Sequence, residues 1–161
     1  MKFFLIFLLP VLLYSCSPQK TSQYSQIEYE AGACFGFCPI FKITIQRDKT
    51  AVIEAERFTF AKGNSKADFS KPKEGTFKTT LTPENFQKLI QLLNGADLKS
   101  LKSEYKNKNV SDLPTAYLRI KYGDGTLKNI EDYGKNGTLK LDEIYQFIEN
   151  LRFVEKWKKV E

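Results

Sequence analysis

The chain has 161 residues, of which 25 are Lys or Arg and 19 are Asp or Glu, with three cysteines and no histidine. Its length predicts one domain, and its 42% hydrophobic and 27% charged fractions are typical of a folded chain. The absence of histidine excludes Ser-His-Asp and Cys-His catalysis, histidine-ligated metal sites and histidine-based pH switches.

The first residues predict an export signal. Met1-Lys2 is followed by an almost unbroken apolar run, Phe3–Tyr14, interrupted only by Pro10. A short cationic start and an apolar stretch of this length predict a secretory signal peptide over residues 1–15. The run is shorter than the ~20 apolar residues that span a bilayer.

The end of this run, Leu13-Tyr14-Ser15-Cys16, resembles the lipobox of bacterial lipoproteins. The resemblance implies that the Cys16 thiol is diacylated, that the chain is cleaved before Cys16 and that the new amino terminus is acylated. Two or three acyl chains hold a protein on a membrane where one holds it only marginally. The alternative is an ordinary signal peptide with Cys16 near its cleavage site. Because Ser17 is not the Asp of inner-membrane retention, we expect an outer-membrane protein that faces the periplasm.

A polar stretch follows the anchor. Residues 17–26 show no apolar periodicity, which predicts a flexible tether between the lipidated Cys16 and a domain over residues 27–157. Removing Lys2 lowers the formal net charge from +6 to +5. We interpret this mild excess as a solvated, lysine-rich surface; attraction to anionic lipids or wall polymers is the alternative.

The domain begins with strand-like sequence. Alternating apolar and polar residues predict strands over residues 27–30, 40–46, 51–60 and 77–81, of which the second and third form a hairpin. The lysine-rich segment 61–76 predicts a loop. Its basic residues invite a nucleic-acid interpretation, but an envelope protein is expected to use them as a solvated loop: Lys62, Lys66, Lys71 and Lys73.

The remaining cysteines, Cys34 and Cys38, are an even pair in an oxidising compartment and predict a disulfide. Gly36 gives the tight loop its backbone freedom, and Pro39 stiffens its exit. A redox-active dithiol is an alternative, although three residues intervene and no helix start follows. A zinc site would need recruited carboxylates to complete its four ligands.

Two helices are predicted further along the chain. Thr82-Pro83-Glu84 is typical of a helix start, and Gly95 can end that helix. Its apolar face consists of Phe86, Leu89, Ile90 and Leu93. Thr138 predicts the cap of a second helix, whose apolar face consists of Leu141, Ile144, Tyr145, Ile148 and Leu151.

A second hairpin lies between the helices. Residues 115–122 and 126–133 alternate around Gly123-Asp124-Gly125, and Asp-Gly is a strong hairpin signal. The economical architecture is a single α+β domain. It has a mainly antiparallel sheet, built from two hairpins plus additional strand, with both helices packed on one face.

Several segments in this order resemble one family. They are Cys34-Phe35-Gly36, Cys38-Pro39-Ile40-Phe41, Lys42–Ile45, Leu98, Leu101, Tyr105, Asp112-Leu113-Pro114-Thr115 and Lys128–Gly134. Together they are similar to the domain of unknown function DUF6438, which is frequent in lipoproteins and secreted proteins of Bacteroidota. The chain departs from the family at Lys49, where the first hairpin usually has Gly, and before Thr138, where a proline usually enters the last helix. The resemblance implies a fold and an address but no catalytic residues.

The leading hypothesis is a non-enzymatic binding or assembly module, held on the membrane through Cys16. We expect Phe35 and Phe37 to contact an envelope protein or polymer; burial of both would exclude this. No cofactor, metal or nucleic acid is expected, and the oligomeric state stays open. The alternatives are a thiol-redox protein using Cys34 and Cys38, and an envelope-polymer hydrolase. The hydrolase would draw its carboxylates from Asp112, Asp124, Glu131 and Asp132.

Overall fold

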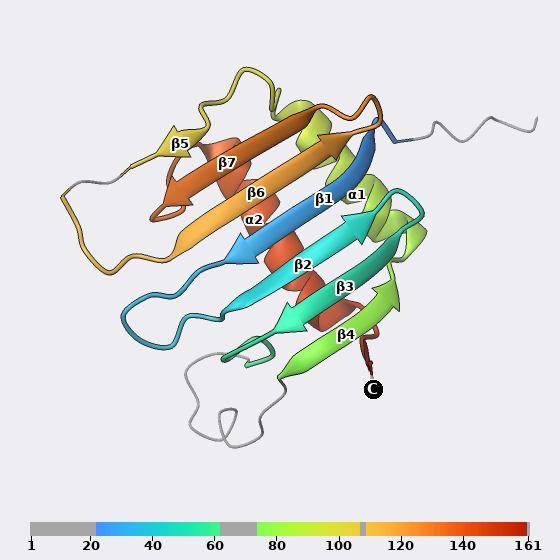
Figure 1. Cartoon of the computed structure of the whole chain (residues 1–161), viewed down its shortest axis with the longest axis horizontal. Helices are drawn as coiled ribbons and strands as arrows, with labels where there is room; N and C mark the ends of the chain where they lie inside the picture. The colour runs from blue at the N-terminus through green and yellow to red at the C-terminus, as the bar shows by residue number, and fades with distance from the viewer. Residues whose placement is uncertain (1–21, 62–73, 107–108, 161) are drawn as a thin grey trace, which may run out of the picture.

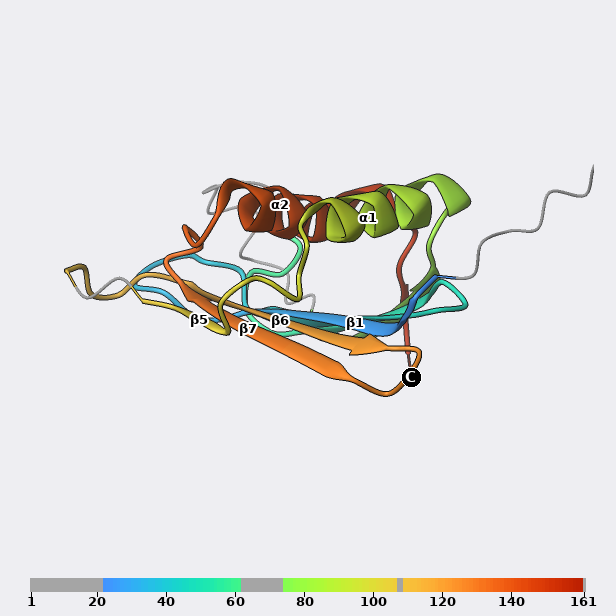
Figure 2. The ribbon, with the colours of Figure 1, turned by 90° about the horizontal axis from the view of Figure 1, so that it is seen from above.

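The computed structural model describes residues 22–61, 74–106 and 109–160. They form a single α+β domain in which two helices lie on one face of an eight-stranded sheet (Figure 1, Figure 2). The predicted fold class is therefore confirmed. Cys16 and the four loop lysines lie outside the described residues.

The sheet is mixed but mostly antiparallel. Its strands are β1 (Tyr24–Ala31), β2 (Phe41–Gln46), β3 (Thr50–Ala55), β4 (Gly75–Thr80), β5 (Glu104–Tyr105), β6 (Thr115–Tyr122), β7 (Leu127–Tyr133) and β8 (Lys158–Lys159). They are arranged in the order β5-β7-β6-β1-β2-β3-β4-β8, and only the β5–β7 pair is parallel. The N-terminal strand β1 is thus central, between the two predicted hairpins.

Both helices begin at the predicted caps. In α1 (Pro83–Gly95), the Thr82 side chain accepts a hydrogen bond from the Asn85 N–H at 3.3 Å. In α2 (Leu139–Val154), Thr138 does the same for the Leu141 N–H at 3.1 Å. These bonds satisfy amide groups that no helical carbonyl can reach. Neither helix of the described part is long and apolar enough to cross a membrane.

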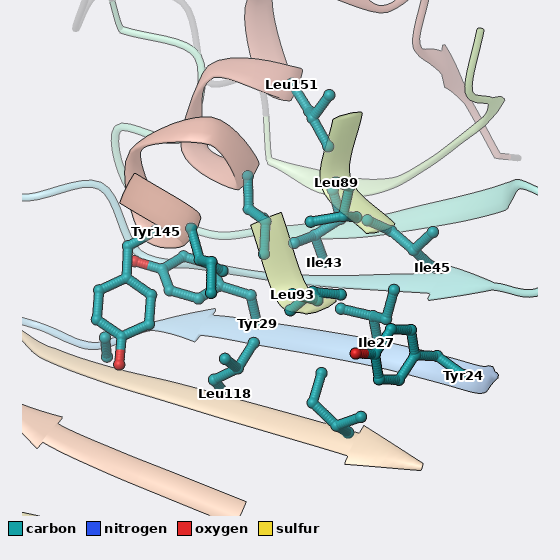
Figure 3. Close-up of a cluster of buried hydrophobic side chains, with 14 of the residues drawn as sticks. Tyr24, Ile27, Tyr29, Ile43, Ile45, Leu89, Leu93, Leu118, Tyr145 and Leu151 are labelled. Carbon is teal, nitrogen blue, oxygen red and sulfur yellow. The ribbon is translucent and has the colours of Figure 1, made fainter. Parts of the chain in front are cut away.

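The core fills the space between the sheet and the helices. Every second residue of β2, of β6 and of β1 from Ile27 onward is buried toward the helices, as the alternating sequence predicts, and a register shift after Tyr24 interrupts the alternation in β1. Figure 3 shows Leu89 and Leu93 of α1 and Tyr145 and Leu151 of α2 above this face. The rings of Tyr29 and Tyr145 lie 5.5 Å apart, so that β1 and α2 are packed directly together.

Three strand predictions differ from the structure. The strand predicted over residues 51–60 ends at Ala55, because the chain turns at Phe58 and packs Phe60 back on Phe77 of β4. β1 begins at Tyr24, inside the predicted tether, and buries that side chain. β5 and β8 were not predicted, since two residues are too few to show a period.

Candidate functional site

The cysteine loop, residues 32–40, connects β1 to β2 at one end of the sheet (Figure 1). A disulfide joins Cys34 to Cys38, whose Cα atoms lie 5.7 Å apart. Between them, Gly36 has a φ of 130°, a conformation that favours glycine. A Cβ atom added to Gly36 would meet nothing within 4 Å, so this part of the loop projects away from the domain.

The two phenylalanines of this loop are exposed. Phe35 has 89% and Phe37 has 62% of its surface accessible, although most phenylalanines are buried. Burial of both rings would have excluded a contact role for them, and neither ring is buried. The Phe37 ring packs edge-on against Phe58, with centroids 5.6 Å apart. We call Phe35, Phe37 and Phe58 the aromatic tip.

Phe58 adopts an unusual backbone conformation. Its φ of 60° is rare for a bulky residue and costs energy unless the surroundings hold it. A short turn contains it, in which the Ala61 N–H donates to the Phe58 carbonyl at 3.1 Å. The guanidinium of Arg57 lies 5.3 Å from its ring centroid. The unfavourable backbone conformation is therefore that of Phe58, the residue whose ring contacts Phe37.

A buried arginine holds this turn in place. The Arg152 Nη1 atom of α2 donates to the Thr59 carbonyl at 2.7 Å, and the Thr59 hydroxyl donates to the Ile40 carbonyl at 2.9 Å. The guanidinium also lies 4.5 Å from the ring centroid of Phe41. Burial lowers the pKa of Arg152, and the negative charge of Glu149 opposes this effect. Arg152 thus links the helix layer to the turn that contains Phe58.

Glu149 is at the centre of a half-buried polar cluster beside Arg152. Its carboxylate contacts the Tyr29 hydroxyl and the Lys135 ammonium group. Its main-chain carbonyl accepts a hydrogen bond from Arg152 Nε at 2.7 Å. Burial, and then the Glu149 charge, raise the pKa of Tyr29. These contacts join β1 to α2 and to the loop that precedes α2.

On its other side, the cysteine loop is hydrogen-bonded to the segment before β6. The Phe35 N–H donates to the Asp112 carbonyl at 3.1 Å, and Asp112 has a φ of 64°. The next residue, Leu113, donates its N–H to the Tyr133 hydroxyl at 3.2 Å. The cysteine loop is consequently held by its disulfide and by neighbours on both sides.

The four candidate carboxylates are not brought together. Asp132 is fully buried and accepts the N–H groups of Asn136 and Gly137 at 3.2 and 3.0 Å, which fixes the chain before α2. Its neighbour Glu131 points to the opposite face of the sheet. Asp124 lies in the β6–β7 turn, at the end of the sheet away from Asp132, and binds Thr126. Asp112 is exposed in the loop before β6.

The surroundings of the cysteines do not include a helix start. Cys38 is followed by Pro39, Ile40 and then β2, so no helix N-terminus stabilises a thiolate there. Within residues 22–61, 74–106 and 109–160, no group of three or more Cys, Asp or Glu side chains is arranged to hold a metal ion.

The sequence did not indicate the support of the aromatic tip. Phe58 lay in a segment that alternates like a strand, and its turn could not be distinguished from that strand by pattern. Arg152 reads as a basic residue in the last turn of a helix, where cations are common. Only the crossing of α2 over the sheet places it beside Thr59 (Figure 1).

The described residues define a two-layer α+β domain with a disulfide-closed loop at one end of its sheet. A family model, the domain of unknown function DUF6438, matches residues 25–152, and the chain belongs to this family. The matched region runs from β1 into α2 and includes the aromatic tip and Arg152. No curated protein matches the chain.

Proposed function

We propose that this protein is a non-enzymatic binding module of the cell envelope, anchored in the outer membrane through lipidated Cys16. The aromatic tip is its contact surface for an envelope protein or polymer. The observation that carries the proposal is the exposure of Phe35 and Phe37 in a loop closed by a disulfide. Exposed apolar groups on a fixed loop favour binding, since little conformational entropy remains to be lost.

The position of the tip relative to the tether supports this function. The tether enters at the start of β1, whereas the cysteine loop follows the end of β1, at the opposite end of the sheet (Figure 1). Eight residues of strand separate these ends by roughly 25 Å. A domain that stands on its tether presents the aromatic tip away from the membrane, toward partners in the periplasm.

The surroundings of the tip favour binding over catalysis. The nearest candidate carboxylate, Asp112, is exposed and contributes its main-chain carbonyl to the loop. Asp132 is fully buried, and its carboxylate accepts the main-chain N–H groups of Asn136 and Gly137. A hydrolase of envelope polymers needs two carboxyl groups within ~5–9 Å on either side of a substrate; the burial of Asp132 and the position of Asp124 at the other end of the sheet count against such a pair.

Affinity capture from solubilised membranes tests the contact surface. The tagged full chain is compared with Phe35→Ala/Phe37→Ala and with Leu139→Ala, a matched control because Leu139 is 85% exposed at the start of α2. We expect one partner with the wild type and Leu139→Ala, and about tenfold less with the double variant. Equal recovery with all three folded proteins would contradict the proposal.

A separate experiment tests the anchor. Cells are labelled with radioactive palmitate, and the full chain is compared with Cys16→Ser. We expect the wild type to carry label and to sediment with membranes, and Cys16→Ser to lose the label. A labelled Cys16→Ser protein, or an unlabelled wild type, would show that the lipobox interpretation is wrong.

A further inference from the structure

A cleft lies at the end of the sheet where the tether joins the domain. It consists of two adjoining hollows of about 260 and 310 Å³, which share part of their walls. The start of β1, the turn after α1 and both hairpin turns contribute to it, and Figure 1 shows these segments at one end of the sheet. We call the following lining residues the tether cleft: Gln23, Arg47, Asp97, Lys99, Tyr122 and Asp124.

Hydrogen bonds hold the walls of the tether cleft. The Gln23 side chain donates to the Asn94 side-chain oxygen at 2.8 Å, and the Gln23 carbonyl accepts the Gly123 N–H at 2.8 Å. The Tyr24 hydroxyl also donates to Asn94, at 2.8 Å. Arg47 is oriented by its Nε atom, which donates to the Tyr24 carbonyl at 3.4 Å. The chain is therefore fixed against the cleft from Gln23 onward.

The tether cleft carries two cations and two carboxylates. The Lys99 ammonium group lies 5.1 Å from the ring centroid of Tyr122. Burial, and then the negative charges of Asp124 and Asp97, raise the pKa of Tyr122, so both carboxylates act on the same ring. In the part of the chain that the structure describes, neither Lys99 nor Arg47 forms an ion pair. Charges of both signs are therefore exposed to a ligand at one place.

The tether limits how far this cleft can lie from the membrane. In a chain processed at Cys16, as proposed above, six residues precede Ser22. Fully extended, they span at most about 22 Å. The cysteine loop lies at the opposite end of β1, roughly 25 Å further away. The anchor thus keeps the tether cleft nearer to the bilayer than the aromatic tip, and this step rests on the proposed anchor.

The charges of the cleft match a headgroup that has a phosphate and a primary amine. Lys99 and Arg47 can donate to phosphate oxygens, and Asp97 and Asp124 can accept from an ammonium group. A purely anionic headgroup would leave both carboxylates without a cation. The charges around the cleft are also nearly balanced, since they are those of Lys49, Lys121 and Asp48.

A folded partner protein fits this place less well. A domain of 100 residues has a radius of gyration of about 13 Å, so it is wider than the gap that the extended tether leaves. The same limit applies to a second copy of this chain. A lipid headgroup of the bilayer itself meets no such limit.

We propose that the tether cleft binds the headgroup of phosphatidylethanolamine in the membrane that holds the lipid anchor. Lys99 and Arg47 bind the phosphate, while Asp97 and Asp124 bind the ammonium group. The domain then rests on the bilayer at this end, and the aromatic tip is held pointing away from it. The contact is independent of the aromatic tip, which lies at the opposite end of the sheet (Figure 1).

Crosslinking to lipids tests this contact. The full lipoprotein carries benzoylphenylalanine at position 100, exposed beside Lys99, or at position 139 near the other end. It is reconstituted in vesicles of phosphatidylcholine, alone or mixed equally with phosphatidylethanolamine or phosphatidylglycerol. Mass spectrometry measures the lipid attached after irradiation. We expect about tenfold more lipid at position 100 with phosphatidylethanolamine than with the other lipids, and none at position 139.

Two sets of variants separate the roles of the charges. Arg47→Gln/Lys99→Gln should lower the lipid yield at position 100 about tenfold, whereas the control Lys158→Gln/Lys159→Gln, an exposed pair on β8, should not. Asp97→Asn should reduce the preference for ethanolamine over choline headgroups, because trimethylammonium donates no hydrogen bond.

Flotation of the vesicles distinguishes this proposal from the anchor. A chain that does not float contradicts the anchor and this proposal with it. A chain that floats but gives no lipid crosslink at position 100 overturns this proposal alone. Equal or higher yields with phosphatidylcholine or phosphatidylglycerol, an unchanged yield in Arg47→Gln/Lys99→Gln, or crosslinks at position 100 to protein instead of lipid would also overturn it.

Discussion

The connections between strands differ at the two ends of the sheet. At the end where the tether enters, the β2–β3 and β6–β7 hairpins reverse in short turns. The Asp48 carboxylate accepts the Thr50 N–H, and the Asp124 carboxylate accepts the Thr126 N–H, both at 2.9 Å. These side chains satisfy the backbone of the turn itself. This end of the sheet closes the fold and presents few apolar groups.

At the other end, longer connections support a surface. The cysteine loop carries exposed Phe35 and Phe37, while Phe58 beneath them has a positive φ and Arg152 is buried behind it. A strained residue, a disulfide and a buried cation all act on the same turn and loop. The comparison teaches that hydrogen bonds within the turns close one end of the sheet, whereas a disulfide and a buried cation hold the connections that carry exposed aromatic residues at the other end.

Replacing Arg152 should lower the stability of the domain more than the other substitutions that test this difference between the two ends. Arg152→Leu removes hydrogen bonds to the carbonyls of Thr59 and Glu149 and leaves Lys135 as the cation that contacts the Glu149 carboxylate. We expect a loss of about 2–4 kcal/mol in the free energy of unfolding, measured with urea. The control Arg57→Leu changes an exposed arginine that contacts the same turn and should cost less than about 0.5 kcal/mol. Equal losses would contradict the role of Arg152.

Removing the disulfide should have the next largest effect. Cys34→Ser/Cys38→Ser opens a loop with a sequence separation of only 4. The loop-closure entropy of so short a segment corresponds to about 2 kcal/mol of stability. We expect a folded protein with a lower urea midpoint and weakened partner capture. A variant that captures the partner as well as the wild type would show that the disulfide does not shape the contact surface.

At the end of the sheet where the tether enters, the stabilisation that Asp124 gives to the β6–β7 turn should depend on pH. The Thr126 N–H lowers the pKa of this exposed carboxyl below its usual value of 3.8. Its stabilisation is therefore complete above that value and is lost as the pH falls through the lower, folded-state pKa. We expect Asp124→Ala to lower the melting temperature by less than loss of the disulfide does. The difference in melting temperature between the wild type and Asp124→Ala should shrink below pH 3.8. A difference that grows in acid would contradict the assignment.

The smallest effect on stability is expected at the aromatic tip. Phe35→Ala removes a ring that is 89% exposed, so little buried surface is lost. We expect the free energy of unfolding to change by less than about 0.5 kcal/mol, measured by urea unfolding. A loss as large as that of Arg152→Leu would show that Phe35 is a structural residue.

The sequence predicted most of the regular structure because its signals are local. Both helix caps, the β6–β7 hairpin and the Cys34–Cys38 disulfide follow from residues a few positions apart. The departure at Lys49 is absorbed locally as well, since this lysine takes the left-handed conformation with a φ of 73°. The fold class followed from the order of these elements.

The support of the candidate site could not be predicted in this way. Arg152 and Thr59 are 93 residues apart, and their contact depends on where α2 crosses the sheet. The turn at Phe58 follows a strand without any glycine or proline to mark it. The tether cleft combines residues of β1, of both hairpin turns and of the turn after α1, which no local pattern brings together.

The central claim is that the aromatic tip binds a partner. The most direct test places a photoreactive benzoylphenylalanine at position 35 or position 139 of the full chain in living cells, followed by irradiation. We predict one discrete crosslinked species from position 35, lost when Phe37→Ala is added, and none from position 139. Position 35 giving no crosslink, or both positions giving the same products, would contradict the claim.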